Sequence, residues 1–415
     1  MSLTRLCSPR TSPSAHHDPS GCLAWISVDN ERVSLLDGFT AASYTPPTIL
    51  FAASQLPTRV RNQLVATKRC TLSAVTTREP IESLEKAQQR PDSLFTDLGL
   101  QPSTRTFDDY PSAVASSPVH MYCQLETFQE LGPNEYLVVL TVETFDIQPQ
   151  ILSEPNEVMK QRPGVLAKID AHLWQPRVSL HSRFTTLASL QSMPRPKQQP
   201  DGTWTSTQFA PIPDTEPRID SSSSYQWSWR EHGGTSPLGY NATTALIMPR
   251  PIGWISTYRD DQPHLAPYSF FTDVASGDQP MVAFSGFRKQ DGKKDAQLNA
   301  ETTGAFCWNF VTYDLTVPMN LSAAEVDRTV SEFALASLAS EPAQHVRAPV
   351  VTASPIQYEC EYVRTIDVGS FSIVVGKVVS VSVSDEVLTD GCVDPSKARP
   401  ITRLGYMDEY GIVDV

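Results

Sequence analysis

No run of apolar residues in this sequence approaches the roughly 18 to 20 that a membrane-spanning helix needs. The seven cysteines contain no Cys-x-x-Cys pair, which argues against a zinc site and a disulfide scaffold and favours reduced thiols. The eight histidines show no ligand spacing, and no Gly-x-Gly-x-x-Gly follows a predicted strand. We therefore expect neither a bound metal nor a Rossmann domain.

Positive charge is also scarce, because 33 Lys and Arg face 46 Asp and Glu, for a formal net charge of −13. Nucleic acid is a poor candidate partner, since phosphate binding needs a basic face. The first 21 residues lack the apolar segment of a signal peptide. These features predict a cytoplasmic protein with neither a nucleic-acid nor a membrane partner.

At 415 residues the chain is long enough for two domains. A stretch rich in proline and serine, residues 193–238, is typical of a connector. It also carries Trp204, Trp227 and Trp229, so we expect part of it to pack on a domain, with a lid over a ligand as the alternative. The predicted organisation is a flexible tail (1–20), a first domain (21–192), the connector (193–238) and a second domain (239–415).

The two predicted domains repeat the same sequence of motifs. Leu23 to Ser27 (LAWIS) matches Ile252 to Ser256 (IGWIS), and Pro47 to Phe51 matches Pro280 to Phe284. Ser117-Pro118 followed by Cys123 matches Ser354-Pro355 followed by Cys360. The offsets drift in order from 229 to 237, which indicates an internal duplication.

Both copies are predicted to be mainly β. Apolar and polar residues alternate over 119–126, 356–362 and 379–384, and MVAFSGF (281–287) and AFCWNFV (305–311) are rich in strand-forming residues. Few helices are expected. Ser322-Ala-Ala-Glu325 predicts a capping box that opens a helix to about Leu338, and Asp295 is expected to cap a shorter helix ending before Gly304. Many short strands favour a closed or partly closed barrel.

Arg250 stands between two prolines, which restrict the backbone on both sides and suggest that it holds a fixed anion. The ordered segments from residue 239 to 412 resemble the flavin reductase-like family, whose fold is the FMN-binding split β-barrel. Those segments are YNATTALIMPRPIGWIST (240–257), HLAPYSFF (264–271), MVAFSGF (281–287), GKKDAQLN (292–299), TTGAFCWN (302–309), SPIQYECE (354–361) and DPSKARPITRLGYMDEY (394–410).

The resemblance implies that the second copy binds FMN. A dianionic phosphate and a polar ribityl chain require cations, hydroxyls and close backbone amides. The residues expected to bind the cofactor are Arg250, Ala266, Pro267, Tyr268, Ser269, Ser285, Lys294, Asn299 and Thr303. Where the family commonly has Lys-Asp-Thr, this sequence has Lys294-Asp295-Ala296, so one hydroxyl ligand is missing.

Several nearby residues have competing interpretations. Arg288 and Lys289 are interpreted as part of a solvated hairpin rather than as phosphate ligands, and His264 as a structural histidine. Asn309 is expected to satisfy backbone groups near the barrel rim. Arg403, Tyr406 and Tyr410 either border the flavin or nicotinamide site or anchor a terminal strand by aromatic packing.

The family forms homodimers with FMN between subunits, so two fused copies resemble a dimer within one chain. The chain itself is then expected to be a monomer or a dimer of such pseudo-dimers. The motifs are eroded in the first copy, where VSLLDGFTAAS replaces the Ala-Pro-Tyr-Ser stretch, so we expect one FMN site. His172, Trp174 and Arg177 are candidates for the wall that the first copy contributes.

The expected function is an FMN-dependent oxidoreductase in which NADH or NADPH delivers hydride to flavin N5 and the flavin reduces a second acceptor. No dedicated catalytic acid or base is required for hydride transfer, and none is identified. Two alternatives remain open: an FMN-dependent oxygenase acting on a small organic substrate, and a flavin-binding or scaffold protein without turnover.

Overall fold

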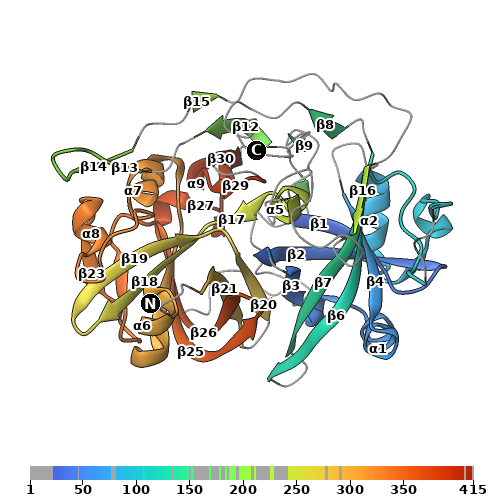
Figure 1. Cartoon of the computed structure of the whole chain (residues 1–415), viewed down its shortest axis with the longest axis horizontal. Coiled ribbons are helices and arrows are strands. Elements are labelled where there is room, and N and C mark those ends of the chain that lie inside the picture. The colour runs from blue at the N-terminus through green and yellow to red at the C-terminus, as the bar shows by residue number, and fades with distance from the viewer. Residues whose placement is uncertain are drawn as a thin grey trace.

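Two β-barrels lie side by side in the computed structural model, one from each half of the chain (Figure 1). The structure describes residues 22–44, 46–75, 81–105, 107, 109–132, 135–148, 151–153, 168–169, 177–178, 183–184, 187–192, 196–206, 210–211, 225–228, 242–275, 279–288, 292–405 and 408–413.

The first barrel is formed by six strands. They are β1 (Cys22–Ser27), β2 (Arg32–Tyr44), β3 (Pro47–Ala52), β4 (Arg69–Ala74), β6 (Val119–Gly132) and β7 (Glu135–Ile147). Their order in the sheet is β1-β4-β6-β7-β3-β2, and β2 also pairs with β1, so the barrel closes on itself. The short β5 (Ser93–Leu94) pairs with the start of β2.

The second barrel repeats this order with one interruption. Its strands are β18 (Gly253–Arg259), β19 (Gln262–Tyr268), β20 (Phe271–Ala275), β21 (Met281–Phe287), β22 (Ala305–Asn309), β25 (Ile356–Val368) and β26 (Phe371–Val383). They are arranged β19-β18-β22-β25-β26-β21-β20. The consecutive strands β19 and β20 occupy the place of the single strand β2, and the break between them falls at Ser269 and Phe270.

The duplication extends to irregularities in strand pairing. The register of β6 against β7 shifts between Tyr122 and Cys123 and again between Leu125 and Thr127. The register of β25 against β26 shifts between Glu359 and Cys360 and between Tyr362 and Arg364, in each case 237 residues later. Because bulges are specific local features of a fold, these matching shifts confirm the duplication in three dimensions.

One helix occupies the same place in each copy, between the third and fourth strand positions. In the first copy it is α1 (Thr58–Thr67), and in the second it is α6 (Asp295–Thr303). Gly304 ends α6 with φ of 76°, a left-handed conformation that suits glycine, as predicted. The expected cap was wrong by one residue: Lys294 is the N-cap, and its N–H donates to Gln297 Oε1 at 3.2 Å.

The predicted helix from Ser322 to about Leu338 is wrong. The helix α7 (Thr316–Leu321) ends just before Ser322, and α8 (Glu332–Leu335) is a separate short turn. Ser322 is buried, where its hydroxyl accepts from Trp254 Nε1 at 2.9 Å and donates to the Met319 carbonyl at 2.7 Å. A tertiary partner therefore uses the hydroxyl that the capping box required.

The two copies pack together through equivalent strands, β2, β3 and β7 of the first and β20, β21 and β26 of the second. One buried apolar cluster combines residues of both copies, namely Ala42, Leu50, Leu137 and Val139 with Val274, Ala275, Met281, Ala283, Val368, Ile373 and Val375. Hydrogen bonds also cross the boundary, since Thr272 Oγ1 donates to the Gly38 carbonyl at 3.0 Å. The contact has the form of an isologous dimer interface within one chain.

Chain segments outside the barrels pair with both copies. The strand β12 (Leu187–Ser192) pairs with β15 (Ala210–Pro211) on one side and with β30 (Glu409–Val413) on the other. In the same sheet, β30 pairs with β29 (Ile401–Arg403), and β29 pairs with β17 (Arg250–Pro251). A strand of the predicted connector, β16 (Tyr225–Ser228), joins β7 and places Trp227 opposite Phe145. Part of the connector thus packs on the first copy as a strap; Trp229 lies outside the described residues.

The remaining elements are short. Helices are α2 (Ile81–Gln89), α5 (Ala242–Leu246) and α9 (Pro395–Ala398), and two-stranded pairs are β8 (Leu152–Ser153) with β9 (Lys168–Ile169), β10 (Arg177–Val178) with β11 (Arg183–Phe184), β13 (Lys197–Gln198) with β14 (Trp204–Thr205), β23 (Ser340–Pro342) with β24 (Pro349–Val351), and β27 (Leu388–Thr389) with β28 (Cys392–Val393). Within the described ranges no helix is long and apolar enough to span a bilayer.

Candidate functional site

The Ala-Pro-Tyr-Ser stretch forms the end of β19, where the second barrel is split. As the first strand of its sheet, β19 pairs with β18 alone, and Pro267 suits such an edge because it has no N–H to donate. Ala266, Pro267 and Ser269 are half-buried. The hydroxyl of Ser269 has no hydrogen-bond partner among the described residues, so this edge offers main-chain atoms and one hydroxyl to a ligand.

Tyr268 lies at the same edge with its ring in the protein. The residue is 6% exposed, and its ring packs on Phe284 with 4.8 Å between centroids. A Cβ on Gly286 would come within 2.9 Å of Tyr268 Cε1, so glycine makes room for the ring. Burial, followed by the nearby charge of Asp295, raises the pKa of Tyr268 far above its ordinary value. The hydroxyl is therefore protonated and, within the described structure, makes no hydrogen bond.

Lys294 stands at the start of α6 beside this ring. Its Nζ lies 6.0 Å from the Tyr268 ring centroid, and the side chain is half-buried. The N-terminus of a helix carries a partial positive charge and favours anions. The structure thus places Lys294 and Tyr268 close together at a position suited to a negatively charged group, while their contact with a cofactor stays a prediction.

Arg250 has a structural role that the sequence did not reveal. The residue is 2% exposed, and its guanidinium donates to four backbone carbonyls, those of Thr244, Ile247, Ser269 and Leu404, at 2.6 to 3.1 Å. These carbonyls belong to the α5 region, the β19–β20 break and the chain after β29. Arg250 therefore fixes the backbone of the candidate site, while its assignment to a cofactor phosphate stays a prediction.

Three other predicted cofactor residues also make hydrogen bonds within the protein. Ser285 Oγ donates to the Ala42 carbonyl of the first copy at 2.7 Å, and Asn299 Nδ2 donates to Thr257 Oγ1 at 3.0 Å. Thr303 Oγ1 lies 2.8 Å from the Asn299 carbonyl and 3.1 Å from the Ala305 carbonyl at the end of α6, and its single proton is donated to one of them. All three hold the elements that carry Tyr268 and Lys294, and their contact with a cofactor is untested.

The competing interpretations are resolved for some neighbours. His264 is buried and its Nδ1 lies 3.0 Å from Glu332 Oε2, which confirms a structural role. Asn309 Nδ2 donates to the Trp254 carbonyl at 3.1 Å, as expected for a rim residue. Arg288 is not simply solvated, because its backbone N–H donates to the Ser370 carbonyl and its side chain to the Gly369 carbonyl. Lys289 lies outside the described residues.

The end of the chain is anchored by packing. Tyr410 is 6% exposed, and the Arg403 guanidinium carbon lies 4.5 Å from its ring centroid. This arrangement favours the structural alternative for both residues, whereas Tyr406 is outside the described residues.

The first copy lacks the groups that form the candidate site. Strand pairing gives the equivalent positions in the two copies. Leu36, which pairs with Ala24, is equivalent to Tyr268, which pairs with Gly253. Ala52, which pairs with Leu137, is equivalent to Ser285, which pairs with Ile373. Pro57 is the N-cap of α1, and Lys294 is the N-cap of α6. Polar groups are replaced by apolar ones at all three positions, which is consistent with one site per chain.

The first copy contributes a residue near the site that sequence reasoning missed. Tyr44, at the end of β2, packs edge-on against Phe270 and Phe371, with ring centroids 5.3 and 5.1 Å away. Phe270 follows Ser269 directly at the break. The predicted wall residues His172 and Trp174 lie outside the described residues, and Arg177 belongs to the short strand β10. Only knowledge of the interface between copies identifies Tyr44.

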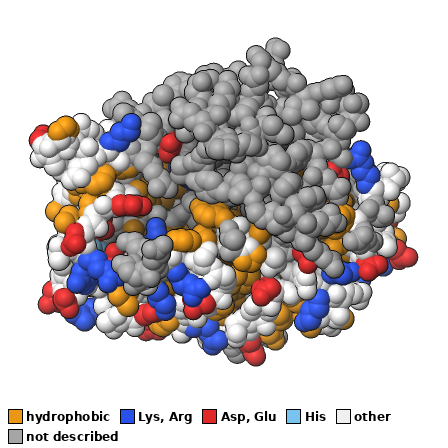
Figure 2. All heavy atoms as spheres, in the orientation of Figure 1, with side chains coloured by type: hydrophobic (Ala, Val, Ile, Leu, Met, Phe, Trp, Pro, Cys, Tyr) orange, Lys and Arg blue, Asp and Glu red, His pale blue; other side chains and the backbone are white. Residues whose placement is uncertain are grey.

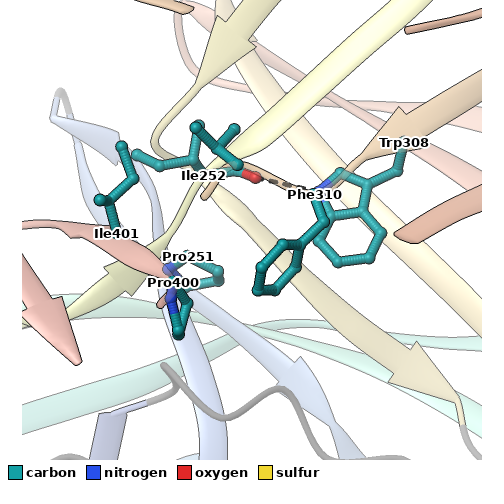
Figure 3. Close-up of a pocket in the computed structure, with 7 residues that line it drawn as sticks. Pro251, Ile252, Trp308, Phe310, Pro400 and Ile401 are labelled. Carbon is teal, nitrogen blue, oxygen red and sulfur yellow. Dashed lines mark hydrogen bonds between the residues drawn. The ribbon is translucent and has the colours of Figure 1, made fainter. Parts of the chain in front are cut away.

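A small apolar hollow lies next to β17. It is lined by Pro251, Ile252, Trp308, Phe310, Val311, Pro400 and Ile401, with Trp308 Nε1 donating to the Ile252 carbonyl at 2.9 Å (Figure 3). Its empty space, about 230 Å³ and partly open to solvent, is below the range typical of a cofactor site. Among the described residues no group of three or more metal-ligating side chains gathers in one place.

Comparison with known proteins places these residues in a family. Residues 245–404 match the model of the flavin reductase like domain. An uncharacterised protein of Deinococcus radiodurans is 32% identical over 180 residues, covering 41% of this chain and 79% of the relative, and one of Aquifex aeolicus is 31% identical over 178 residues, covering 41% and 90%. The crystal structure of nitrilotriacetate monooxygenase component B from Bacillus cereus is 27% identical with a TM-score of 0.41, covering 42% of this chain and 90% of that one. The chain belongs to the flavin reductase-like family.

Proposed function

We propose that the protein is an FMN-dependent oxidoreductase that takes hydride from NADH or NADPH and passes reducing equivalents to a second acceptor. FMN would be held mainly by the second copy at its cleft with the first, and flavin N5 would supply the redox chemistry. Family membership supports flavin binding and reductase-type chemistry. The observation that carries the proposal is the break between β19 and β20, where Ser269 follows Tyr268 and the Lys294 amine lies 6.0 Å from the Tyr268 ring centroid.

The residues of the site fit a phosphorylated flavin. Ala266 and Pro267 present backbone at a strand edge, which a flat ring can approach closely. The hydroxyls of Ser269 and Tyr268, which have no hydrogen-bond partner among the described residues, suit the ribityl chain or the phosphate. The α6 N-terminus with Lys294 favours an anion. Arg250 holds the Ser269 carbonyl at 3.1 Å, so the edge is fixed before any ligand binds.

The role of the chain is then to orient and enclose the reactants. Hydride transfer needs no proton at a protein side chain, which is consistent with the absence of an identified acid or base. Ser285, Asn299 and Thr303 keep β21 and α6 in place, and Tyr44 closes one side of the break from the first copy. Such preorganisation lowers the entropic cost of bringing two reactants together.

An absorption experiment tests the proposal. The purified chain, reconstituted with FMN and freed of excess, is expected to show flavin bands near roughly 370 and 450 nm that bleach on anaerobic addition of NADH or NADPH. A protein that retains FMN but does not bleach with either donor contradicts the reductase proposal and leaves flavin binding intact. A protein that cannot retain FMN contradicts both.

A second candidate function is flavin binding without turnover. The observation that favours it is the number of predicted ligands already engaged in the protein, since Arg250, Ser285, Asn299 and Thr303 all donate to protein acceptors. The same experiment separates the two functions, because bound flavin that no reductant bleaches supports the binding role.

A further inference from the structure

Two separate segments bring cations to the start of α6. Lys293 and Lys294 precede the helix, and Arg328 reaches it from the connection between β22 and β25, residues 310–355. Figure 2 shows Lys and Arg side chains interspersed with Asp and Glu over the half of the molecule where Figure 1 places the second copy. Glu301 pairs with Lys293 and Asp295 pairs with Arg328, so these three cations meet two carboxylates at α6 in a chain with a net charge of −13.

Arg328 is held in place from both of its sides. Its Nε lies 2.6 Å from Asp295 Oδ1, and its Nη2 donates to the Lys293 carbonyl at 3.4 Å. Its own carbonyl accepts from Arg259 Nη1 at 2.9 Å, so the backbone is tied to β18. The side chain is 41% exposed, and its Nη1 has no hydrogen-bond partner in the described part of the chain.

Tyr268 gives an independent indication that a ligand belongs here. The residue is 6% exposed, and its hydroxyl has no hydrogen-bond partner in the described part of the structure, so the hydroxyl is available to a ligand. The ring lies beside α6, because a Cβ on Gly286 would come within 2.9 Å of Tyr268 Cε1 and 3.0 Å of Gln297 Nε2. The Lys294 amine lies over the same ring.

The first turn of α6 lacks the hydroxyl that the family's Lys-Asp-Thr motif provides. Ala296 stands at that position and is 4% exposed within the apolar core of the second barrel. The position therefore contributes packing and no hydrogen bond, and an anion at the helix start would need another donor.

We propose that Arg328, Lys294 and the Tyr268 hydroxyl form the site for the phosphate of FMN, with Arg328 supplying the donor that position 296 lacks. This inference rests on the proposed function and deepens it. Asp295 fixes one edge of the guanidinium, and the remaining donors face a dianion as charge-assisted hydrogen bonds. Arg328 is then the residue that distinguishes FMN from riboflavin, which has no phosphate.

The test is the affinity of the full chain for both flavins, measured by quenching of flavin fluorescence. Arg328→Ala is expected to weaken FMN binding by roughly 10- to 100-fold and to change riboflavin binding less than about twofold. Tyr268→Phe should weaken FMN binding less, by about 3- to 10-fold. The matched control is Arg347→Ala, which removes an arginine on the same connection that is 59% exposed and paired with Asp261, and should change neither affinity.

Three outcomes overturn the inference. If Arg328→Ala leaves FMN affinity unchanged while the wild type binds FMN, Arg328 is not a phosphate ligand and the proposed function survives. If Arg328→Ala weakens both flavins equally, its role is structural, which a lowered urea midpoint of the variant would show. If the wild type binds neither flavin, both the inference and the proposed function are wrong.

Discussion

Ser285 Oγ donates to the Ala42 carbonyl at 2.7 Å and thereby joins the two copies of the fold in the middle of their interface. Ser285 is 3% exposed and Ala42 is fully buried, so neither group has water as an alternative partner. A residue predicted from family resemblance to hold a cofactor thus holds the pseudo-dimer together.

Replacing this hydroxyl should destabilise the protein in the absence of flavin. Ser285→Ala leaves the buried Ala42 carbonyl without its partner, at a cost of about 1–3 kcal/mol. Urea denaturation of the flavin-free chain measures the loss. Ser382→Ala, at an exposed position of β26, is the control and should have no effect. An unchanged midpoint for Ser285→Ala would show that the bond contributes nothing to the interface.

Arg250 is expected to be essential for folding, whatever its part in binding. Arg250→Ala removes donors from four buried carbonyls, and hydrogen bonds to a charged group contribute about 1.5–3 kcal/mol each. We expect a loss above about 3 kcal/mol, seen as a large fall in the urea midpoint. Arg250→Lys should restore little, because an ammonium group cannot reproduce the planar fork.

The exposed Arg347 provides the comparison for Arg250. Arg347→Ala should change the free energy of unfolding by less than about 0.5 kcal/mol. A stable, well-folded Arg250→Ala protein that has lost only flavin affinity would contradict the structural role and restore the original prediction of an anion ligand.

Gly286 sets the position of the Tyr268 ring. In Gly286→Ala the new methyl would lie 2.9 Å from Tyr268 Cε1 and 3.0 Å from Gln297 Nε2, so the ring or the glutamine must move. We expect about 1–3 kcal/mol of destabilisation and weaker FMN binding. Gly132→Ala is the matched control, since its methyl would meet Met281 Cε at an ordinary 3.8 Å. If Gly286→Ala and Gly132→Ala have the same free energy of unfolding and the same FMN affinity, the Tyr268 ring tolerates displacement.

The raised pKa of Tyr268 predicts a loss of stability in alkali. Burial and Asp295 hold the folded-state pKa above the ordinary value of about 10, so the unfolded chain releases this proton first as the pH rises. The stability that this raised pKa contributes is fully present below pH 10 and is lost progressively as the pH rises above 10. Tyr268→Phe should therefore lose less stability than the wild type between pH 9 and 11. Parallel stability curves for the two proteins would contradict the environment described for Tyr268.

Much of the fold was predictable because its signals are local. Alternating residues 119–125 and 356–362 form β6 and β25, and MVAFSGF is the strand β21 from end to end. The three matching motif pairs likewise predicted the duplication that the shared strand order confirms. Short-range periodicity and long motifs carry this information without knowledge of tertiary contacts.

The roles that the sequence did not reveal belong to residues whose partners lie far away in the chain. Ser322 was expected to cap a helix, but Trp254, 68 residues earlier, uses its hydroxyl. The sequence predicts cofactor contacts for Ser285 and Arg250 but does not show that Ala42 and Leu404 lie beside them, so it could not reveal these structural hydrogen bonds. Nothing in the segment around Arg328 points to its ion pair with Asp295, so the sequence offered no basis for the role that we propose for Arg328.

The number of FMN molecules bound by one chain tests the central claim most directly. Calorimetric titration of the flavin-free, full-length protein with FMN is predicted to give one site per chain, because Leu36, Ala52 and Pro57 replace Tyr268, Ser285 and Lys294 in the first copy. Two sites per chain would show that the first copy is also competent, and no binding would contradict a flavin site in the second.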